Sequence, residues 1–180
     1  MKKRDNKEIW ILARYLILLG LMFSLPFIYK IFTPITVYPV VWLLKLFFSR
    51  IDYIQDIILI NNLISIKIIP ACIAGSAYLL LLILNLSVPM NNKKRFYSIL
   101  SSLGMLLLLN IFRIFILSVL YVNNFVFFDF THKLFWYFLS TVFVVGIWFF
   151  VIKIFGIKEV PVWSDIKSLL KKIKFSKNSK

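Results

Sequence analysis

Three residues of reactive types stand out in this sequence. Cys72 is the only cysteine and His132 the only histidine, while Arg113 lies within a long apolar stretch. A thiolate is a strong nucleophile, an imidazole carries protons, and a guanidinium stabilises an oxyanion. Together these groups are the equipment for acyl transfer through a thioester. One cysteine and one histidine without a carboxylate pair cannot complete a closed zinc site, so we expect no metal and no cofactor.

Each of these residues also has an interpretation without chemistry. A lone cysteine is usually a small buried hydrophobe, and an arginine in a membrane helix can pair with a carbonyl or a lipid phosphate. A lone interfacial histidine is usually a hydrogen-bonding cap. Asp129 precedes His132 by three residues and could orient the imidazole, although a solvated loop acid is the simpler interpretation. Cys72 opens a predicted helix, where the helix dipole favours a thiolate.

Three neighbouring residues are predicted to position a substrate. Asn110 lies one turn before Arg113 on the same helix face and could bond the guanidinium or a ligand. Gly75 and Ser76 lie one turn after Cys72 and are expected to leave room for a close approach to the thiol.

The elements that carry these residues are predicted to be membrane helices. Hydrophobic residues make up 61% of the 180 residues and charged residues only 16%, against about half and a quarter in soluble domains. The 22 basic and 7 acidic residues give a net charge of +15, but the basic residues form no stripe for a nucleic acid. This composition excludes a cytosolic globular enzyme, a disordered chain and a nucleic-acid-binding protein.

Four apolar runs reach the length of about 20 residues that crosses a bilayer. They are residues 9–29, 71–89, 96–122 and 132–155. Basic residues cluster in the head, in the loop at 91–95 and in the tail, which places these regions in the cytoplasm. With four spans, the head, the loop and the tail lie on the same side of the membrane only if the shorter apolar stretch 34–48 does not cross it. It is therefore predicted as an interfacial helix within an outer loop at 30–70, with a fifth span as the alternative.

Two smaller elements complete the prediction. In residues 57–69, two β-branched runs flank Asn61 and Asn62, a pattern typical of a β-hairpin. Residues 159–180 have the spacing of a basic amphipathic helix on the anionic inner leaflet. We expect one membrane domain over residues 1–158, an all-α polytopic protein whose four-span helical bundle carries the interfacial helix and the hairpin.

The order of the reactive residues resembles a known family. Residues 70–78, Pro-Ala-Cys-Ile-Ala-Gly-Ser-Ala-Tyr, resemble the Ala-Cys-x-x-Gly signature of the exosortase/archaeosortase family. Residues 110–114, Asn-Ile-Phe-Arg-Ile, resemble its Asn-x-x-Arg-Ile motif, and His132 falls where the third basic residue belongs. The resemblance covers residues 34–155, in a short form, and the Ala-Gly-Ser-Ala-Tyr continuation is closer to the archaeal type. Many bacterial members differ by having Ser or Thr and then Gly directly after the cysteine.

This resemblance implies a polytopic cysteine transpeptidase in the plasma membrane, with both termini cytoplasmic and the active site on the extracytoplasmic face. Its partners would be exported proteins that end in a short motif, a hydrophobic span and a basic cluster. Cleavage at the motif would release the protein or join it to a lipid or other anchor. Cys72 would be the nucleophile, Arg113 would stabilise the oxyanion or position the substrate, and His132 would be the acid/base.

A non-enzymatic protein is the alternative from another class. A small membrane assembly subunit or lipid-binding protein would keep Arg113 as a headgroup anchor and Cys72 as packing. A transporter has less support, because four spans with one intramembrane charge and no internal repeat provide little pathway.

Overall fold

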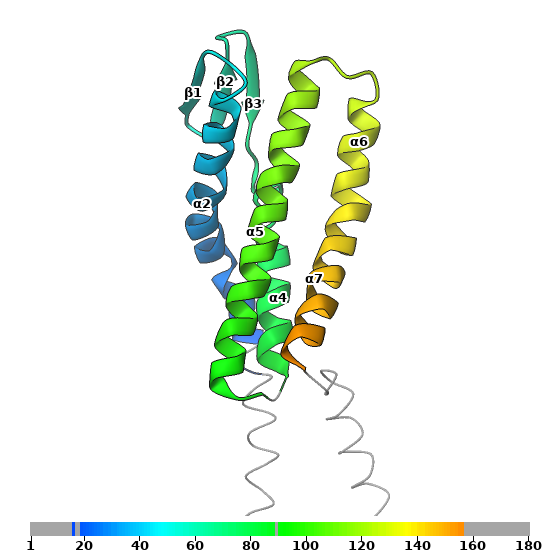
Figure 1. The fold of residues 1–180 in the computed structure, drawn as a ribbon. Coiled ribbons are helices and arrows are strands. Elements are labelled where there is room, and N and C mark those ends of the chain that lie inside the picture. The colour runs from blue at the N-terminus through cyan, green and yellow to red at the C-terminus, as the bar shows by residue number, and fades with distance from the viewer. Residues whose placement is uncertain (1–15, 17–18, 89, 157–180) are drawn as a thin grey trace, which may run out of the picture.

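A computed structural model describes residue 16 and residues 19–88 and 90–156 of the chain. They form an elongated bundle of helices with a small sheet at one end (Figure 1). Within these residues, three helices are long and apolar enough to cross a membrane, as expected of a membrane protein. The tail helix predicted at 159–180 lies outside the described residues.

The first of these helices runs over Leu19–Lys45. It begins with a 3-10 turn, η1 (Met22–Ser24), and continues as α2 (Leu25–Lys45). Side chains of its second half, including Val37, Val40 and Leu44, are fully buried. The second half of α2 is therefore part of the bundle.

This helix corrects the prediction of a span at 9–29 followed by a separate interfacial helix at 34–48. Pro34 and Pro39 both lie inside α2, which runs through them without a break. Proline removes a helical N–H and usually ends a helix in water. Within a bilayer, neighbouring helices and local adjustments satisfy the freed carbonyls, so proline is tolerated. The prolines were thus misinterpreted as the start of a new element.

A three-stranded antiparallel sheet follows α2, in the order β1-β2-β3. Its strands are β1 (Ile51–Ile54), β2 (Ile57–Ile60) and β3 (Ile64–Lys67). The predicted hairpin is confirmed as β2–β3, with Asn61 and Asn62 at φ of 52° and 55°. β1 was not predicted from the sequence, and it joins β2 through Gln55 and Asp56, which also have positive φ. Two such residues form the turn that suits the twist of a hairpin, although Gln-Asp is an uncommon sequence for it.

The segment predicted as a span at 71–89 is interrupted. It contains a four-residue helix, α3 (Pro70–Ile73), and then α4 (Gly75–Ser87). Ala74 separates them in the left-handed conformation, at φ 59° and ψ 36°. With 13 residues, α4 is about 20 Å long and shorter than the three candidate spans. The four-span count is therefore not confirmed.

The last two predicted spans correspond to long apolar helices. The first is α5 (Asn92–Val122). The second is a continuous run over Phe128–Phe155, formed by α6 (Phe128–Leu134), a π-helical turn η2 (Phe135–Leu139) and α7 (Ser140–Phe155). The sequence placed both helices correctly to within four residues at their starts.

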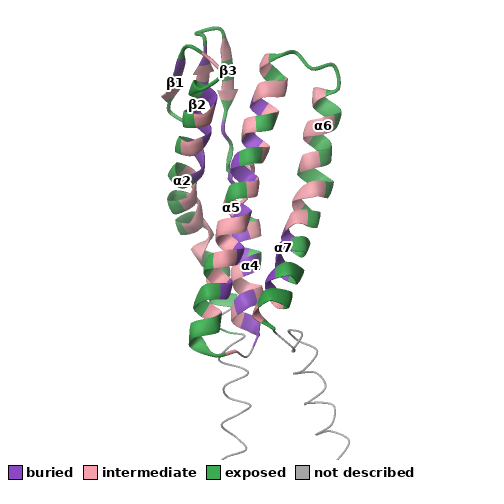
Figure 2. Cartoon of the chain, in the orientation of Figure 1, coloured by how far each residue is buried: buried purple, intermediate pink, exposed green. Residues whose placement is uncertain are grey.

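Buried apolar side chains form two clusters. We define the upper core as the cluster of α2, the sheet, α3 and the second half of α5, which includes Val40, Ile58 and Ile114. The lower core joins α4, α5 and α7 through residues such as Leu81 and Val151. By contrast, α6 and η2 contain no buried residue (Figure 2). The bundle is therefore tightly packed at one end and open between the sheet and α6 at the other.

Candidate active site

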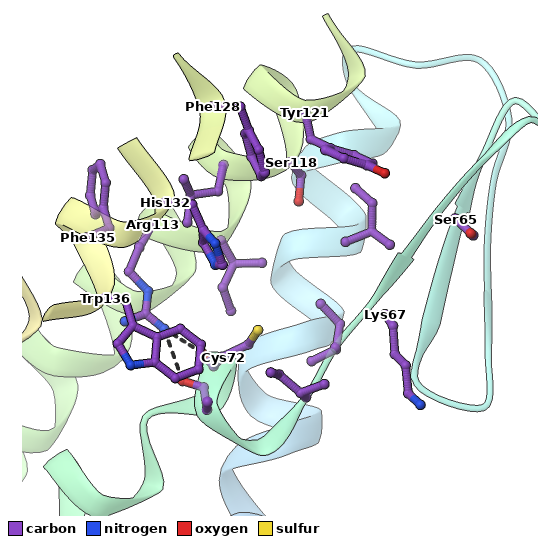
Figure 3. Close-up of a pocket in the computed structure, with 16 residues that line it drawn as sticks. Ser65, Lys67, Cys72, Arg113, Ser118, Tyr121, Phe128, His132, Phe135 and Trp136 are labelled. Carbon is purple, nitrogen blue, oxygen red and sulfur yellow. Dashed lines mark hydrogen bonds between the residues drawn. The ribbon is translucent and has the colours of Figure 1, made fainter. Parts of the chain in front are cut away.

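A cavity of about 270 Å³ lies between β3, α5 and α6 (Figure 3). Its lining includes Cys72 from α3, Arg113 from α5 and His132 from α6. The close-up shows the sulfur, the guanidinium and the imidazole gathered at the same end of this cavity. The structure thus brings together the three residues that the sequence singled out, although they come from separate segments of the chain.

Cys72 lies deeper in the bundle than the sequence predicted. The expectation was the outer end of a span, but β3 and the two residues after it descend along α5 before α3 begins (Figure 1). The Cys72 carbonyl accepts a hydrogen bond from Arg113, nine residues before the end of α5 at Val122. At 1.5 Å per residue, this level is about 13 Å below that helix end. The thiol itself is half-buried and lines the cavity.

Two polar side chains of α5 hold the cysteine segment in place. Arg113 Nη2 donates to the carbonyl oxygens of Ala71, at 3.4 Å, and Cys72, at 2.9 Å. Asn110 Nδ2 donates to the carbonyl oxygens of Cys72, at 3.0 Å, and Ile73, at 3.1 Å. A short helix leaves its last carbonyls without helical partners, and a buried carbonyl without a partner is costly. Arg113 and Asn110 therefore cap α3.

These contacts bear on two open points of the sequence analysis. The pairing of Arg113 with backbone carbonyls, left open as an alternative, is confirmed. Asn110 was predicted to position a substrate, but it is 3% exposed and does not line the cavity of Cys72. Its amide hydrogens are donated to the protein's own backbone, so Asn110 positions the segment of Cys72, and its contact with a substrate stays a prediction.

The π-helical turn links α7 to the arginine. Arg113 Nη1 donates to Ser140 Oγ at 2.9 Å, and Ser140 Oγ donates to the Phe135 carbonyl at 2.7 Å. In a regular helix, residues 132 and 140 would be rotated by about 80° from each other. The extra residue that a π-turn absorbs reduces this angle to about 20°. His132 and Ser140 can therefore both face Arg113. Ser140 was not predicted as a site residue, because a single serine within an apolar run carries no signal in the sequence.

The imidazole of His132 is held by aromatic rings. Phe128 stacks on it, with ring centroids 5.7 Å apart and planes at 8°, and Trp136 meets it edge-on at 6.0 Å. No hydrogen bond or ion pair joins the imidazole to another described residue, and Asp129 is exposed. Phe128 and Trp136 also line the cavity. Phe128 and Trp136 lie four residues before and four residues after His132, on the same helix face. This spacing is the sequence signal by which they could have been predicted as neighbours of the imidazole.

Gly75 and Ser76 lie away from the cavity, contrary to their predicted role beside the thiol. A Cβ on Gly75 would lie 2.5 Å from the Tyr29 ring, so the space at this glycine is already filled by α2. Ser76 is exposed on α4. The small size of Gly75 therefore serves helix packing and not access to Cys72.

The described residues contain no group of three or more His, Cys, Asp or Glu side chains that could hold a metal ion. Searches with models of known families, among curated proteins and among solved structures found no match to this chain.

Proposed function

We propose that this protein is a membrane cysteine peptidase or transpeptidase of the exosortase/archaeosortase type. The observation that supports the proposal is the shared cavity of Cys72, Arg113 and His132. A nucleophile, a cation and a proton carrier from three different elements surround one space where a peptide bond fits. Cys72 carries the only thiol of the sequence, and it lines this cavity.

The proposed reaction has two stages. The Cys72 thiolate attacks the carbonyl carbon of a peptide bond, forms a C–S bond and leaves an oxyanion. The C–N bond then breaks, and the His132 imidazolium donates its proton to the leaving amine. In the second stage, an amine, a hydroxyl group or water attacks the thioester, His132 accepts its proton, and the Cys72 sulfur leaves.

Arg113 acts in this scheme through position and charge. Its hydrogen bond to the Cys72 carbonyl fixes the backbone of the nucleophile. A guanidinium has five N–H donors, and the three acceptors contacted by Arg113 do not use all of them. In the proposed reaction, the remaining donors stabilise the oxyanion that forms on the carbonyl oxygen when the sulfur attacks the carbonyl carbon. A permanent positive charge in this apolar surrounding also favours the negative charge that develops during attack.

The charge distribution supports an orientation. Lys93, Lys94 and Arg95 lie at the start of α5, at the end of the bundle opposite the sheet (Figure 1). Cytoplasmic segments are enriched in basic residues, so that end is assigned to the cytoplasm. The sheet and the mouth of the cavity then face the outer side of the plasma membrane. The substrates are exported proteins with a C-terminal motif, an apolar span and a basic cluster, and a lipid is one possible class of acceptor.

The test is the variant Cys72→Ala. Removal of the sulfur abolishes the proposed cleavage, while the backbone contacts of Cys72 remain. The measurement is the mature C-terminus, by mass spectrometry, of exported proteins from the same genome that carry such a signal. Ser76→Ala is the matched control, because Ser76 is exposed outside the cavity. Unchanged C-termini in the Cys72→Ala strain would reject the proposal.

The second candidate is a non-catalytic assembly or lipid-binding protein. It is favoured by one observation, that Arg113 bonds oxygens of the protein itself. Under this alternative, Cys72→Ala has no effect on any C-terminus, and Cys72 does not react with a membrane-impermeant thiol reagent in intact cells. Rapid labelling of Cys72 would exclude inert packing.

A further inference from the structure

The strand β3 has a free edge. Antiparallel strands alternate between hydrogen-bonded and non-hydrogen-bonded residue pairs. The Ile68 N–H donates to the Asp56 carbonyl at 2.8 Å, which makes Ile66 and Ile58 a hydrogen-bonded pair. Ser65 and Lys67 alternate with these residues and lie in non-hydrogen-bonded pairs with β2. Their N–H and C=O groups therefore point away from β2.

These outward groups have no partner among the described residues. No hydrogen bond within that part of the protein uses the main chain of Ser65 or Lys67 on its free side. The N–H of Ile69 is also without a described partner, whereas its carbonyl accepts from the Cys72 N–H at 2.8 Å. The edge therefore offers donors and acceptors at two-residue intervals, a spacing that a second extended strand matches.

The free edge faces the cavity. Five consecutive residues, 65–69, line it, so both faces of the strand border the space and its edge is directed into it. The opposite wall is formed by α5 and α6, through residues such as Leu117 and Phe128. The strand leads directly to α3 and the sulfur of Cys72 (Figure 3). The cavity therefore has a strand edge on one side and helix side chains on the other, and the occupant that pairs with a strand edge is one extended peptide.

We propose that the substrate binds as an additional β-strand on the free edge of β3, between that strand and α6. Main-chain hydrogen bonds to Ser65 and Lys67 then supply affinity that does not depend on substrate side chains. This inference rests on the proposed function, because it places the peptide bond to be cleaved at Cys72. It names the substrate conformation, an extended segment of about five residues before the scissile bond.

The direction of the bound strand follows from the orientation. The exported body of the substrate lies on the outer side, beyond Ser65, and its apolar span continues toward the cytoplasm, below Cys72. The segment before the scissile bond therefore runs from the sheet toward Cys72. This is the direction of β3 itself, so the pairing is parallel.

The experiment measures alkylation of Cys72 in the purified full-length protein by mass spectrometry. The probe is a five-residue peptide of alternating Thr and Val that ends in a C-terminal chloromethyl ketone. The thiolate displaces chloride and forms a C–S bond. Two analogues carry N-methyl groups on alternate amides, one on the odd and one on the even residues. A fourth probe has the same sequence but carries its reactive group, a chloroacetyl group, at the N-terminus. The rate at which each probe labels Cys72 is divided by the rate at which the same probe alkylates glutathione.

We expect one N-methyl analogue to label at least tenfold more slowly than the parent peptide and the other to label at a similar rate. This two-residue period is the signature of a β-ladder. The N-terminal probe, which can only bind in the antiparallel direction, should label more slowly. Equal rates for both N-methyl analogues and the parent would overturn strand addition, and faster labelling by the N-terminal probe would overturn the parallel direction.

A pair of variants tests the edge from the protein side. Lys67→Pro and Lys67→Ala both lose the amine, but only proline removes the outward N–H, and edge strands tolerate proline. We expect labelling about fivefold slower in Lys67→Pro than in Lys67→Ala. Equal rates would contradict a role for this N–H. Because alkylation requires no cleavage, these results are independent of the Cys72→Ala test, and the failure of one proposal is distinguishable from the failure of the other.

Discussion

The two halves of the helix over Phe128–Phe155 differ sharply. The lower half, α7, buries four residues against α4 and α5, among them Trp148, which is 8% exposed. The upper half, α6 with η2, buries none, and Trp136 is 42% exposed. One continuous helix therefore serves as scaffold at one end and as a cavity wall at the other.

The short α4 explains this difference. α4 begins at Gly75, partway along the bundle (Figure 1). Of the two halves of the Phe128–Phe155 helix, it is α7 that packs against α4. At the level of α6, the chain before α4 is the extended strand β3, which fills less space than a helix. The cavity lies at this level, where the strand leaves space beside α5 and α6. Stability and chemistry are thus expected to separate along the bundle axis.

The largest expected effect concerns the two tryptophans. Trp148→Ala should lower the free energy of unfolding by about 3–5 kcal/mol, because it opens a void in the lower core. Trp136→Ala should lower it by less than about 1 kcal/mol while reducing substrate processing. The measurement is reversible unfolding of the purified protein in detergent mixtures. Similar losses for both variants would show that the two halves pack equally well.

Arg113 should affect processing more than folding. Arg113→Ala is expected to slow processing about a hundredfold, because it removes both the cap of Cys72 and the charge at the site. Arg113→Lys should retain only part of the wild-type rate of processing, since an ammonium cannot bridge Ser140 and Cys72 as a planar guanidinium does. Asn123→Ala, at the exposed end of α5 and outside the cavity lining, is the control. Full activity in Arg113→Lys would reduce the role of arginine to charge alone.

Two adjacent hydroxyl groups test the π-helical turn. Ser140→Ala removes the acceptor of Arg113 Nη1 and should slow processing about fivefold. Thr141 also donates to a carbonyl, that of Tyr137 at 3.3 Å, but it is exposed and distant from the cavity lining. Thr141→Ala should therefore have no effect on processing. Equal effects of the two variants would show that the hydroxyl groups act only on the helix.

The smallest effect concerns the sheet. Burial, and then the hydrogen bond to Asp56, raise the pKa of Tyr53 to about 12, compared with an ordinary value of about 10. Because the pKa is raised in the folded state, the contribution of Tyr53 to stability is complete below pH 10 and is lost as the pH rises through 12. The check is phenolate absorbance against pH for the wild type and for Tyr53→Phe. A difference curve centred at pH 10 would contradict the contact with Asp56.

Much of the architecture could be predicted from the sequence because it depends on local patterns. The lengths of the apolar runs predicted α5 and the helix over Phe128–Phe155, and Asn61-Asn62 predicted the turn of the β2–β3 hairpin. The continuous helix through Pro34 and Pro39 could not be predicted in this way. Whether a proline breaks a helix depends on what surrounds the freed carbonyl, and those neighbours come from other parts of the chain.

The candidate site shows the same division. The types of Cys72, Arg113 and His132 were sufficient to select them as chemical groups. The roles of Asn110 and Ser140 were not accessible, because their partners lie 27 to 38 residues away in the sequence. The free edge of β3 was also hidden, since β1 was missed and the order of the strands was unknown.

The long apolar helices, the hairpin with its asparagine turn and three candidate groups for acyl transfer could be predicted from residue types and local spacing alone. The local periodicity and composition of the sequence carry that information, because each helix or turn is stabilised largely by nearby residues. Three features became visible only in the folded chain: α3 ends after four residues, a π-turn directs Ser140 toward Arg113, and a strand edge opens onto the cavity of Cys72. Each of these features depends on hydrogen bonds or packing between segments far apart in the chain.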